Sequence, residues 1–160
     1  KSFIAQNPFL NKNPKPRIVF DSRISLHRGE WTNAHDIASK IKDHLDPDIF
    51  EVDVVDDVAA LSVAEQAALY HGASIVVAPQ GSSLANVVFM KPHSIILEIS
   101  CGEKSWVRDW ASDLKIRHSS VRSEGPSCNF EGHRTFFVRP AALVDLILDI
   151  CWKGTKKKTN

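Results

Sequence analysis

Short apolar, β-branched runs alternate with helix-length segments along most of this chain. The runs predict strands at residues 17–20, 49–55, 73–78, 94–99, 115–121 and 134–138. The segments between and after them predict helices from 32 or 33 to about 46 and at 62–71, 83–90, 104–114 and 140–151. Near-continuous apolar strands separated by such helices are typical of a parallel sheet covered on both faces. The alternation therefore predicts an α/β fold, a Rossmann-like, doubly wound, mostly parallel sheet with helices on both faces.

Several helix ends carry their own signals. Thr32 or Asn33 can cap the first predicted helix, and Pro47 ends it. Ser62 followed three residues later by Glu65 is the pattern of a capping box. These signals support the boundaries drawn from the apolar pattern.

The chain has the length of one globular domain. It contains 160 residues, of which 43% are hydrophobic and 24% charged. We predict a lead-in linker at 1–16, which holds three of the eight prolines, a domain at 17–152 and a basic tail at 153–160. Because the sequence begins at Lys1, a targeting segment can lie outside it, and we leave the compartment open between the lumen of the Golgi or endoplasmic reticulum and the cytoplasm.

The formal net charge of +1 hides an uneven distribution. Eight of the 20 basic residues lie in the two ends, so residues 21–152 hold 12 basic and 19 acidic residues, a net charge of −7. Non-specific nucleic-acid binding needs clustered Lys and Arg, so we expect no nucleic-acid partner. No apolar run, including that around 95–99, approaches the roughly 20 residues that cross a bilayer, so we expect no membrane span.

Three cysteines, Cys101, Cys128 and Cys151, are each more than 20 residues from the next. They form no zinc-binding spacing, and the histidines show no ligand pairing at i+4, so we predict no metal site. One disulfide with a free thiol and three reduced thiols are both compatible with this spacing.

The segment most informative about chemistry runs from Ile75 to Asn86. An apolar strand ends near Pro79, a glycine and two serines make a turn, and a helix follows at once. Ligands of open α/β sheets bind at the carboxyl ends of the strands, and a helix N-terminus offers unpaired N–H groups to an anion. The turn can therefore cradle a diphosphate. The alternative is that a tight strand-to-helix turn simply needs small residues.

The order of the segments resembles the C-terminal half of family 61 glycosyltransferases. That family reads as an apolar strand, His-Gly-Ala-Gly-Leu-Thr-Asn, Phe-Met/Leu-x-Pro and a strand ending in Val-Ile-Glu-Ile. The residues that match it in spacing and type are Gly81, Leu84, Asn86, Phe89, Met90, Pro92, Glu98 and Ile99. The pair at 65–66 ahead of the strand also matches, as does Arg23 followed ten residues later by Asn33, so the likeness covers about 17–121.

Three positions of the turn depart from the family pattern. Gln80 stands where the family has His, and Ser82 and Ser83 stand where it has Ala and Gly. A glutamine amide cannot act as a base, although it can hydrogen-bond a diphosphate oxygen. Two functions therefore remain: an active transferase, or a divergent, non-catalytic module that binds nucleotide or glycan or acts as a scaffold. A generic nucleotide-binding domain is disfavoured because neither GxGxxG nor GxxxxGK[ST] is present.

The resemblance implies the donor-binding domain of a GT-B type enzyme. Such a domain binds a nucleotide-sugar, here most simply a UDP-sugar, and transfers a hexosyl or pentosyl group to a glycan or protein acceptor. It requires no metal and no other cofactor, because arginines and helix N–H groups stabilise the departing diphosphate. A chain of this length would be completed by a second, upstream domain that binds the acceptor.

The resemblance also implies roles for individual residues. Arg23 and Arg28 would clamp the diphosphate, unless they are solvated surface residues. The general base is harder to assign: Asp21 and His27 are candidates, and the missing domain is another source. The residues expected to bind the nucleotide-sugar are Gln80, Gly81, Ser82, Ser83, Asn86 and Glu98.

Three of these interpretations have alternatives. Glu98 would accept the ribose hydroxyls or cap the next helix, and Asn86 with Gln66 would tie the turn to neighbouring backbone. Trp106 and Trp110, four residues apart, would share one face of a helix and pack into the core, or would form an aromatic platform for a base or sugar.

Overall fold

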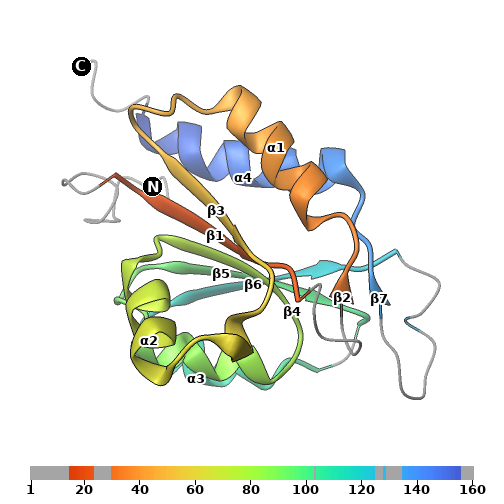
Figure 1. Cartoon of the computed structure of the whole chain (residues 1–160). Coiled ribbons are helices and arrows are strands. Elements are labelled where there is room, and N and C mark those ends of the chain that lie inside the picture. The colour runs from red at the N-terminus through yellow and green to blue at the C-terminus, as the bar shows by residue number, and fades with distance from the viewer. Residues whose placement is uncertain (1–14, 24–29, 103, 125–127, 129–134, 156–160) are drawn as a thin grey trace.

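The computed structural model describes residues 15–23, 30–102, 104–124, 128 and 135–155. Five parallel strands form one twisted sheet between two layers of helices (Figure 1). The strands are β1 (Arg17–Asp21), β3 (Glu51–Val55), β4 (Ile75–Pro79), β5 (Ile95–Ser100) and β6 (Arg117–Arg122). Their order across the sheet is β3-β1-β4-β5-β6. Numbered along the chain this is 2-1-3-4-5, one of the two common doubly wound orders. The predicted fold class is confirmed.

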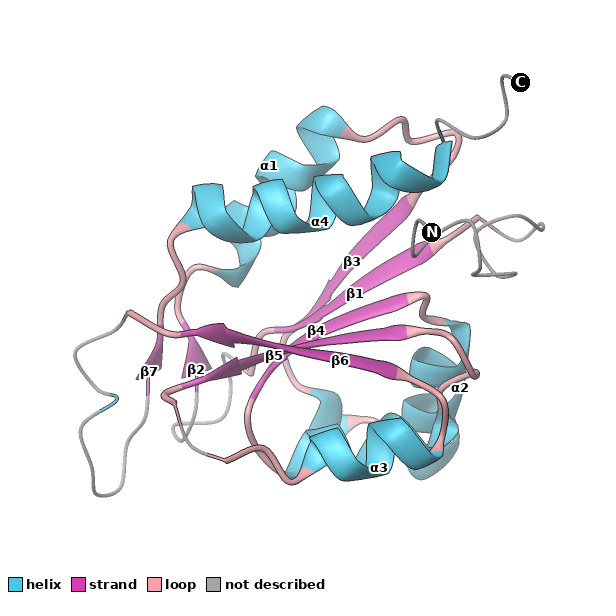
Figure 2. Ribbon diagram, turned by 180° about the vertical axis from the view of Figure 1, so that it is seen from behind, coloured by secondary structure: helices cyan, strands magenta, loops and turns pink. Residues whose placement is uncertain are grey.

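Helices cover both faces of the sheet. The helices α1 (Ala34–His44) and α4 (Pro140–Thr155) pack together on one face (Figures 1 and 2). The other face carries α2 (Val63–Gly72), α3 (Val107–Asp113) and the 3₁₀ helices η2 (Val58–Ala60) and η3 (Ser82–Phe89). Outside the main sheet, β2 (Glu30–Trp31) pairs in parallel with β7 (Thr135–Phe136).

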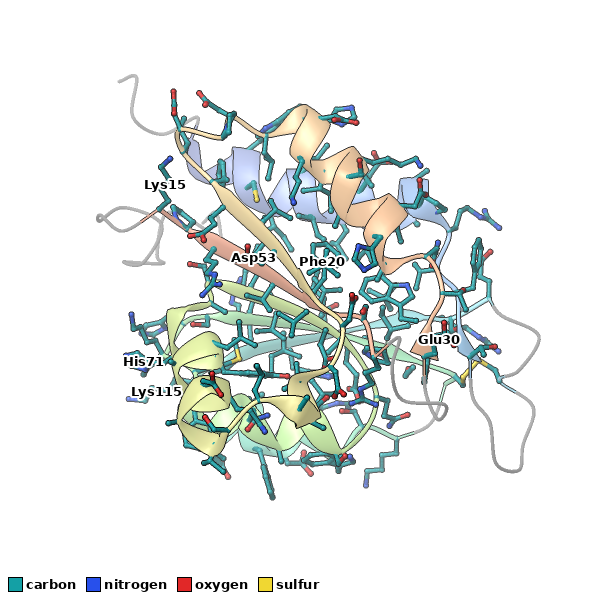
Figure 3. All side chains as sticks on the ribbon, viewed as in Figure 1. Lys15, Phe20, Glu30, Asp53, His71 and Lys115 are labelled. Carbon is teal, nitrogen blue, oxygen red and sulfur yellow. A yellow bond between two sulfur atoms is a disulfide. The ribbon has the colours of Figure 1, made fainter. Side chains whose placement is uncertain are left out.

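The central strands are mostly apolar because they are buried on both sides. Along β1, Ile18 and Phe20 face the layer of α1 and α4, whereas Val19 faces the layer of α2 and α3. Phe20 lies among the apolar side chains between the sheet and α1 (Figure 3). Figure 3 also shows Lys15, His71 and Lys115 at the edge where β1 and β6 begin. The opposite, carboxyl-terminal edge is the one where a doubly wound sheet binds ligands.

Most predicted helix signals are confirmed, and one acts differently from expectation. Ser62 and Glu65 form the capping box at the start of α2. Asn33 is at the cap position of α1, but its side chain makes no capping hydrogen bond. Its amide instead donates to the Val138 carbonyl and accepts from the Trp31 indole, which ties α1 to the chain near β7.

One prediction from the apolar pattern was wrong, and one pair of alternatives is decided. The strand expected at 134–138 is the two-residue β7, which lies outside the main sheet. Of the two alternatives for Trp106 and Trp110, core packing is excluded, because they are 39% and 47% exposed and contact each other edge to face. Residues 1–14 of the lead-in predicted at 1–16 and most of the predicted tail lie outside the described residues.

The cysteines resolve into one of the two alternatives. Cys101, directly after β5, forms a disulfide with Cys128, and Cys151 is a free, buried thiol in α4. Among the described residues, no helix is both long and apolar enough to cross a membrane.

Candidate active site

The site lies where the sheet changes winding direction. The strand β1 pairs with β3 on one side and β4 on the other, so the connections after β1 and β4 leave in opposite directions. A crevice opens outside the carboxyl ends of the strands at such a point. The end of β1 contributes Asp21 and Arg23, and the turn after β4 contributes Gln80 to Ser83. The fold therefore brings together two groups of predicted residues that are about 60 positions apart in sequence.

Arg23 reaches from the end of β1 to the turn after β4. Its backbone has a φ of 55°, in the left-handed region that non-glycine residues seldom adopt and that often marks functional sites. The side chain is buried, and its Nη1 donates to the Gln80 carbonyl at 3.3 Å. Its Nη2 donates to the Ser83 hydroxyl. The guanidinium thus holds both ends of the turn that contains Gly81.

Gly81 is required by the close approach of this guanidinium. A Cβ atom at this position would clash with Arg23 Nη1 and lie 2.8 Å from Nη2. Any side chain here would have to push the guanidinium out of its place. The glycine therefore does more than allow a tight turn, because it admits the cation that lies against that turn.

Asp21 is a buried acid beside this cation. Its Oδ2 accepts a hydrogen bond from the Ser83 hydroxyl at 2.6 Å and lies 3.7 Å from Arg23 Nε. Burial raises the pKa of Asp21, and this effect outweighs the lowering by Arg23 and by the Ser83 hydrogen bond. Tyr70 is buried nearby, and its pKa is also raised, by burial and then by the charge of Asp21. Tyr70 therefore stays neutral behind the site.

The raised pKa of Asp21 predicts a specific pH dependence of stability. Its stabilising contribution is complete below the ordinary value of 3.8 and is lost as the pH rises through the folded-state pKa. Asp21→Asn keeps an oxygen that can accept from Ser83, and because an amide does not ionise, the variant does not lose this stability as the pH rises. We expect the variant to gain stability over wild type as the pH rises above 3.8, by at most about 1.4 kcal/mol per pH unit. Urea unfolding between pH 3 and 8 measures this; a stability difference that does not change with pH would contradict it.

A cavity of about 340 Å³ opens beside these residues. Its walls come from the end of β1, from η2, from the first turns of α2 and from η3, and include Asp21, Arg23, Ser82, Ser83 and Asn86. Two buried polar atoms here, Asp21 Oδ1 and Arg23 Nε, have no hydrogen-bond partner among the described residues. Buried polar atoms are normally satisfied, so two unpaired ones in residues of the cavity wall mark this cluster as a candidate functional site.

Asn86 lines the same cavity and is hydrogen-bonded to Gln66 of α2. Its amide donates to Gln66 Oε1 at 2.9 Å, and the Gln66 amide donates to the Leu61 carbonyl at 2.8 Å. This chain of bonds ties η3 to the start of α2, as one of the two interpretations of the sequence predicts. Asn86 also lines the cavity, so a role in binding stays a prediction.

Two further predicted residues, Glu98 and Gln80, belong to β5 and to the turn that follows β4. Glu98 is in β5, two residues before its end, and is completely buried. Its Oε2 is 2.6 Å from His118 Nε2, which is also 3.3 Å from the Ser105 hydroxyl. The Gln80 amide donates to the Lys104 carbonyl at 3.4 Å. Neither residue lines the cavity around Asp21 and Arg23, and the predicted contact between Glu98 and a ribose stays a prediction.

Comparison with known protein families assigns the chain to one of them. The family model described as Glycosyltransferase 61 matches residues 1–97. The chain belongs to glycosyltransferase family 61. The matched part includes β1, β4 and the Gly81 turn, so the residues that surround the cavity come from the part of the chain that carries the family pattern.

Other similarities are remote. No curated protein sequence matches the chain. Among solved structures, a diflavin flavoprotein A3 from Nostoc sp. matches with a TM-score of 0.49 and 13% identity, over 91% of this chain and 93% of that one. The family assignment therefore rests on the sequence pattern.

Two predicted site residues lie outside the described residues, and two contacts near the site were not predicted from the sequence. Arg28 and His27 fall outside the described residues. The roles of Tyr70 behind Asp21 and of His118 beside Glu98 were missed, because each contact joins elements that are distant in sequence and leaves no local pattern. Within the described residues, no three His, Cys, Asp or Glu side chains form a group that could hold a metal ion.

Proposed function

We propose that this family 61 glycosyltransferase domain binds a nucleotide-sugar at the Gly81 turn and transfers its sugar without a metal ion. The observation that carries the proposal is the Arg23 guanidinium, which lies against a glycine turn at the switch point of the sheet, beside a cavity with unpaired polar atoms. A UDP-sugar is the first donor to test, and hexosyl and pentosyl groups both remain candidates.

The diphosphate of such a donor would bind at the start of η3. The first N–H groups of a helix have no partners within it and favour an anion. Arg23 adds a planar cation suited to phosphate oxygens. During transfer, an acceptor oxygen forms a bond to the anomeric carbon while the bond to the diphosphate oxygen breaks. The bonding electron pair leaves with the diphosphate, and Arg23 and the N–H groups stabilise its growing charge.

The rest of the proposal concerns the complete enzyme. We infer a GT-B arrangement in which a second, N-terminal domain binds a glycan or protein acceptor across from this site. The acidic body of the domain, with a net charge of −7 over residues 21–152, would repel a diphosphate. The local cation at the Gly81 turn is therefore essential to donor binding.

Calorimetric titration with UDP, GDP and their sugars tests the proposal. We expect Arg23→Gln to weaken nucleotide binding about 10- to 100-fold, because it removes a charge-assisted contact with phosphate. Arg17→Gln is the matched control: Arg17 begins the same strand and pairs with Asp53 at the opposite edge of the sheet. Equal loss in both variants, or no nucleotide binding by the wild type, would contradict the proposal. Binding of a nucleotide-sugar without cleavage to nucleoside diphosphate would favour the non-catalytic module.

A further inference from the structure

A second polar cluster lies at the carboxyl-terminal edge of the sheet, outside the cavity. Ser22, directly after Asp21, donates from its hydroxyl to Asp56 Oδ1 at 2.6 Å. His35, in the first turn of α1, places its Nε2 2.6 Å from the same oxygen. Asp56 directly follows β3. Three segments thus converge on one carboxylate.

The cluster determines which nitrogen of His35 carries the proton. The hydrogen bonds from Ser22 and then His35 lower the pKa of Asp56, so its carboxyl is ionised at neutral pH. An ionised carboxylate can only accept hydrogen bonds, so His35 Nε2 must donate. In the neutral ring the basic lone pair is then on Nδ1. The His35 side chain is 55% exposed, which leaves the ring accessible to a substrate.

The cluster shares its backbone with the proposed donor site. Ser22 lies between Asp21 and Arg23 in the chain, and both of these line the cavity. Ser22 hydrogen-bonds to Asp56, which also contacts His35 of α1, whereas its neighbours Asp21 and Arg23 both contact Ser83 of η3. Asp56 is likewise two residues before Val58, another residue of the cavity wall. The cluster and the cavity therefore flank the same switch point from the two faces of the sheet.

We propose that His35, oriented by Asp56 and Ser22, is the general base that activates the acceptor hydroxyl. This inference rests on the glycosyl transfer proposed above. His35 Nδ1 takes the hydroxyl proton while the acceptor oxygen bonds to the anomeric carbon, and the bond from that carbon to the diphosphate breaks with its electron pair. Asp56 stabilises the imidazolium that forms. The role is separate from donor binding, which belongs to Arg23 and the Gly81 turn.

A purely structural role predicts different behaviour. An exposed ion pair between α1 and the end of β3 would contribute about 1 kcal/mol or less to stability and nothing to turnover. A matched control for this alternative is His44, an exposed residue at the end of the same helix whose Nδ1 lies 2.6 Å from the Lys40 carbonyl. His35→Gln and His44→Gln therefore differ in the proposed function and not in helix or exposure.

The test measures nucleotide affinity and turnover separately. Calorimetry with UDP and GDP gives the dissociation constant. Release of nucleoside diphosphate from the corresponding sugars gives the rate; it is measured on the complete enzyme, which includes the inferred acceptor-binding domain, with water and a panel of mono- and oligosaccharides as acceptors. We expect His35→Gln to keep the nucleotide dissociation constant within about twofold and to lower the maximal rate about 100-fold or more. His44→Gln should match wild type in both.

Asp56→Ala tests the positioning role. It removes the oxygen that accepts from Nε2, so nothing at this position holds the ring proton there or stabilises the imidazolium. Long-range ¹H–¹⁵N correlations of the histidine rings should show Nε2–H for His35 in wild type and a mixture of both tautomers in the variant, together with a rate loss similar to that of His35→Gln.

The outcomes separate this inference from the proposed function. Equal rates in His35→Gln and His44→Gln, or an Nδ1–H ring in wild type, would overturn His35 as the base. Nucleotide binding without release in wild type would also overturn it and would leave donor binding intact. Absence of nucleotide binding would instead overturn the proposed function itself.

Discussion

Gly81→Ala is expected to weaken nucleotide binding about 10- to 100-fold while the domain stays folded. The added Cβ would clash with Arg23 Nη1, so the guanidinium must leave the turn. The displaced Arg23 then loses its contact with the diphosphate, and a charge-assisted hydrogen bond contributes about 1.5 to 3 kcal/mol, which corresponds to the expected loss of affinity.

Gly72→Ala is the matched control for this substitution. Gly72 is the last residue of α2, and a Cβ there would meet its nearest neighbour, Arg17 Nη1, at an ordinary 3.6 Å. The two variants are compared by calorimetry with UDP and by urea unfolding. Nucleotide affinity unchanged in Gly81→Ala would show that the position of Arg23 does not matter for binding.

Removing the disulfide between Cys101 and Cys128 is expected to cost about 3 to 4 kcal/mol of stability. The bond closes a loop with a sequence separation of 27, and cross-links of this size restrict the unfolded chain by about this amount. The third cysteine should not interfere, because burial raises the pKa of the Cys151 thiol to about 12 and keeps it unreactive.

Urea unfolding of wild type with and without a reductant measures this effect. The double variant Cys101→Ser/Cys128→Ser should match reduced wild type and should not respond to reductant. Equal stability of oxidised and reduced wild type would contradict the expectation. A disulfide of this kind is typical of proteins that fold in an oxidising compartment.

The centre of the sheet was predictable from the sequence because β1, β4 and β5 are buried on both faces. Such strands read as mostly apolar runs, for example Ile75 to Ala78, and α2 carries its own capping box. The pairing of β2 with β7 was not predictable, because two-residue strands are too short to show a period. Trp106 and Trp110 illustrate a related limit: their spacing shows that they share a helix face but not whether that face is covered.

The sequence allowed prediction of the segments that form the site, but not of the contacts between their side chains. The carboxyl ends of β1 and β4 were expected to meet, and they do. The left-handed backbone of Arg23, its position against Gly81 and the bridge through Ser83 depend on tertiary packing. The same holds for the buried pair of Glu98 and His118, and for the convergence of Ser22, His35 and Asp56, since these partners are 13 to 34 residues apart and no motif joins them.

The most direct test of donor binding is a crystal structure of this chain with UDP bound. We predict that the diphosphate lies at the start of η3, with its oxygens within hydrogen-bond distance of the Ser82 and Ser83 backbone N–H groups and of the Arg23 guanidinium. A nucleotide bound at another edge of the sheet, with the contacts of Arg23 to Gln80 and Ser83 unchanged, would contradict the assignment of this turn as the donor site.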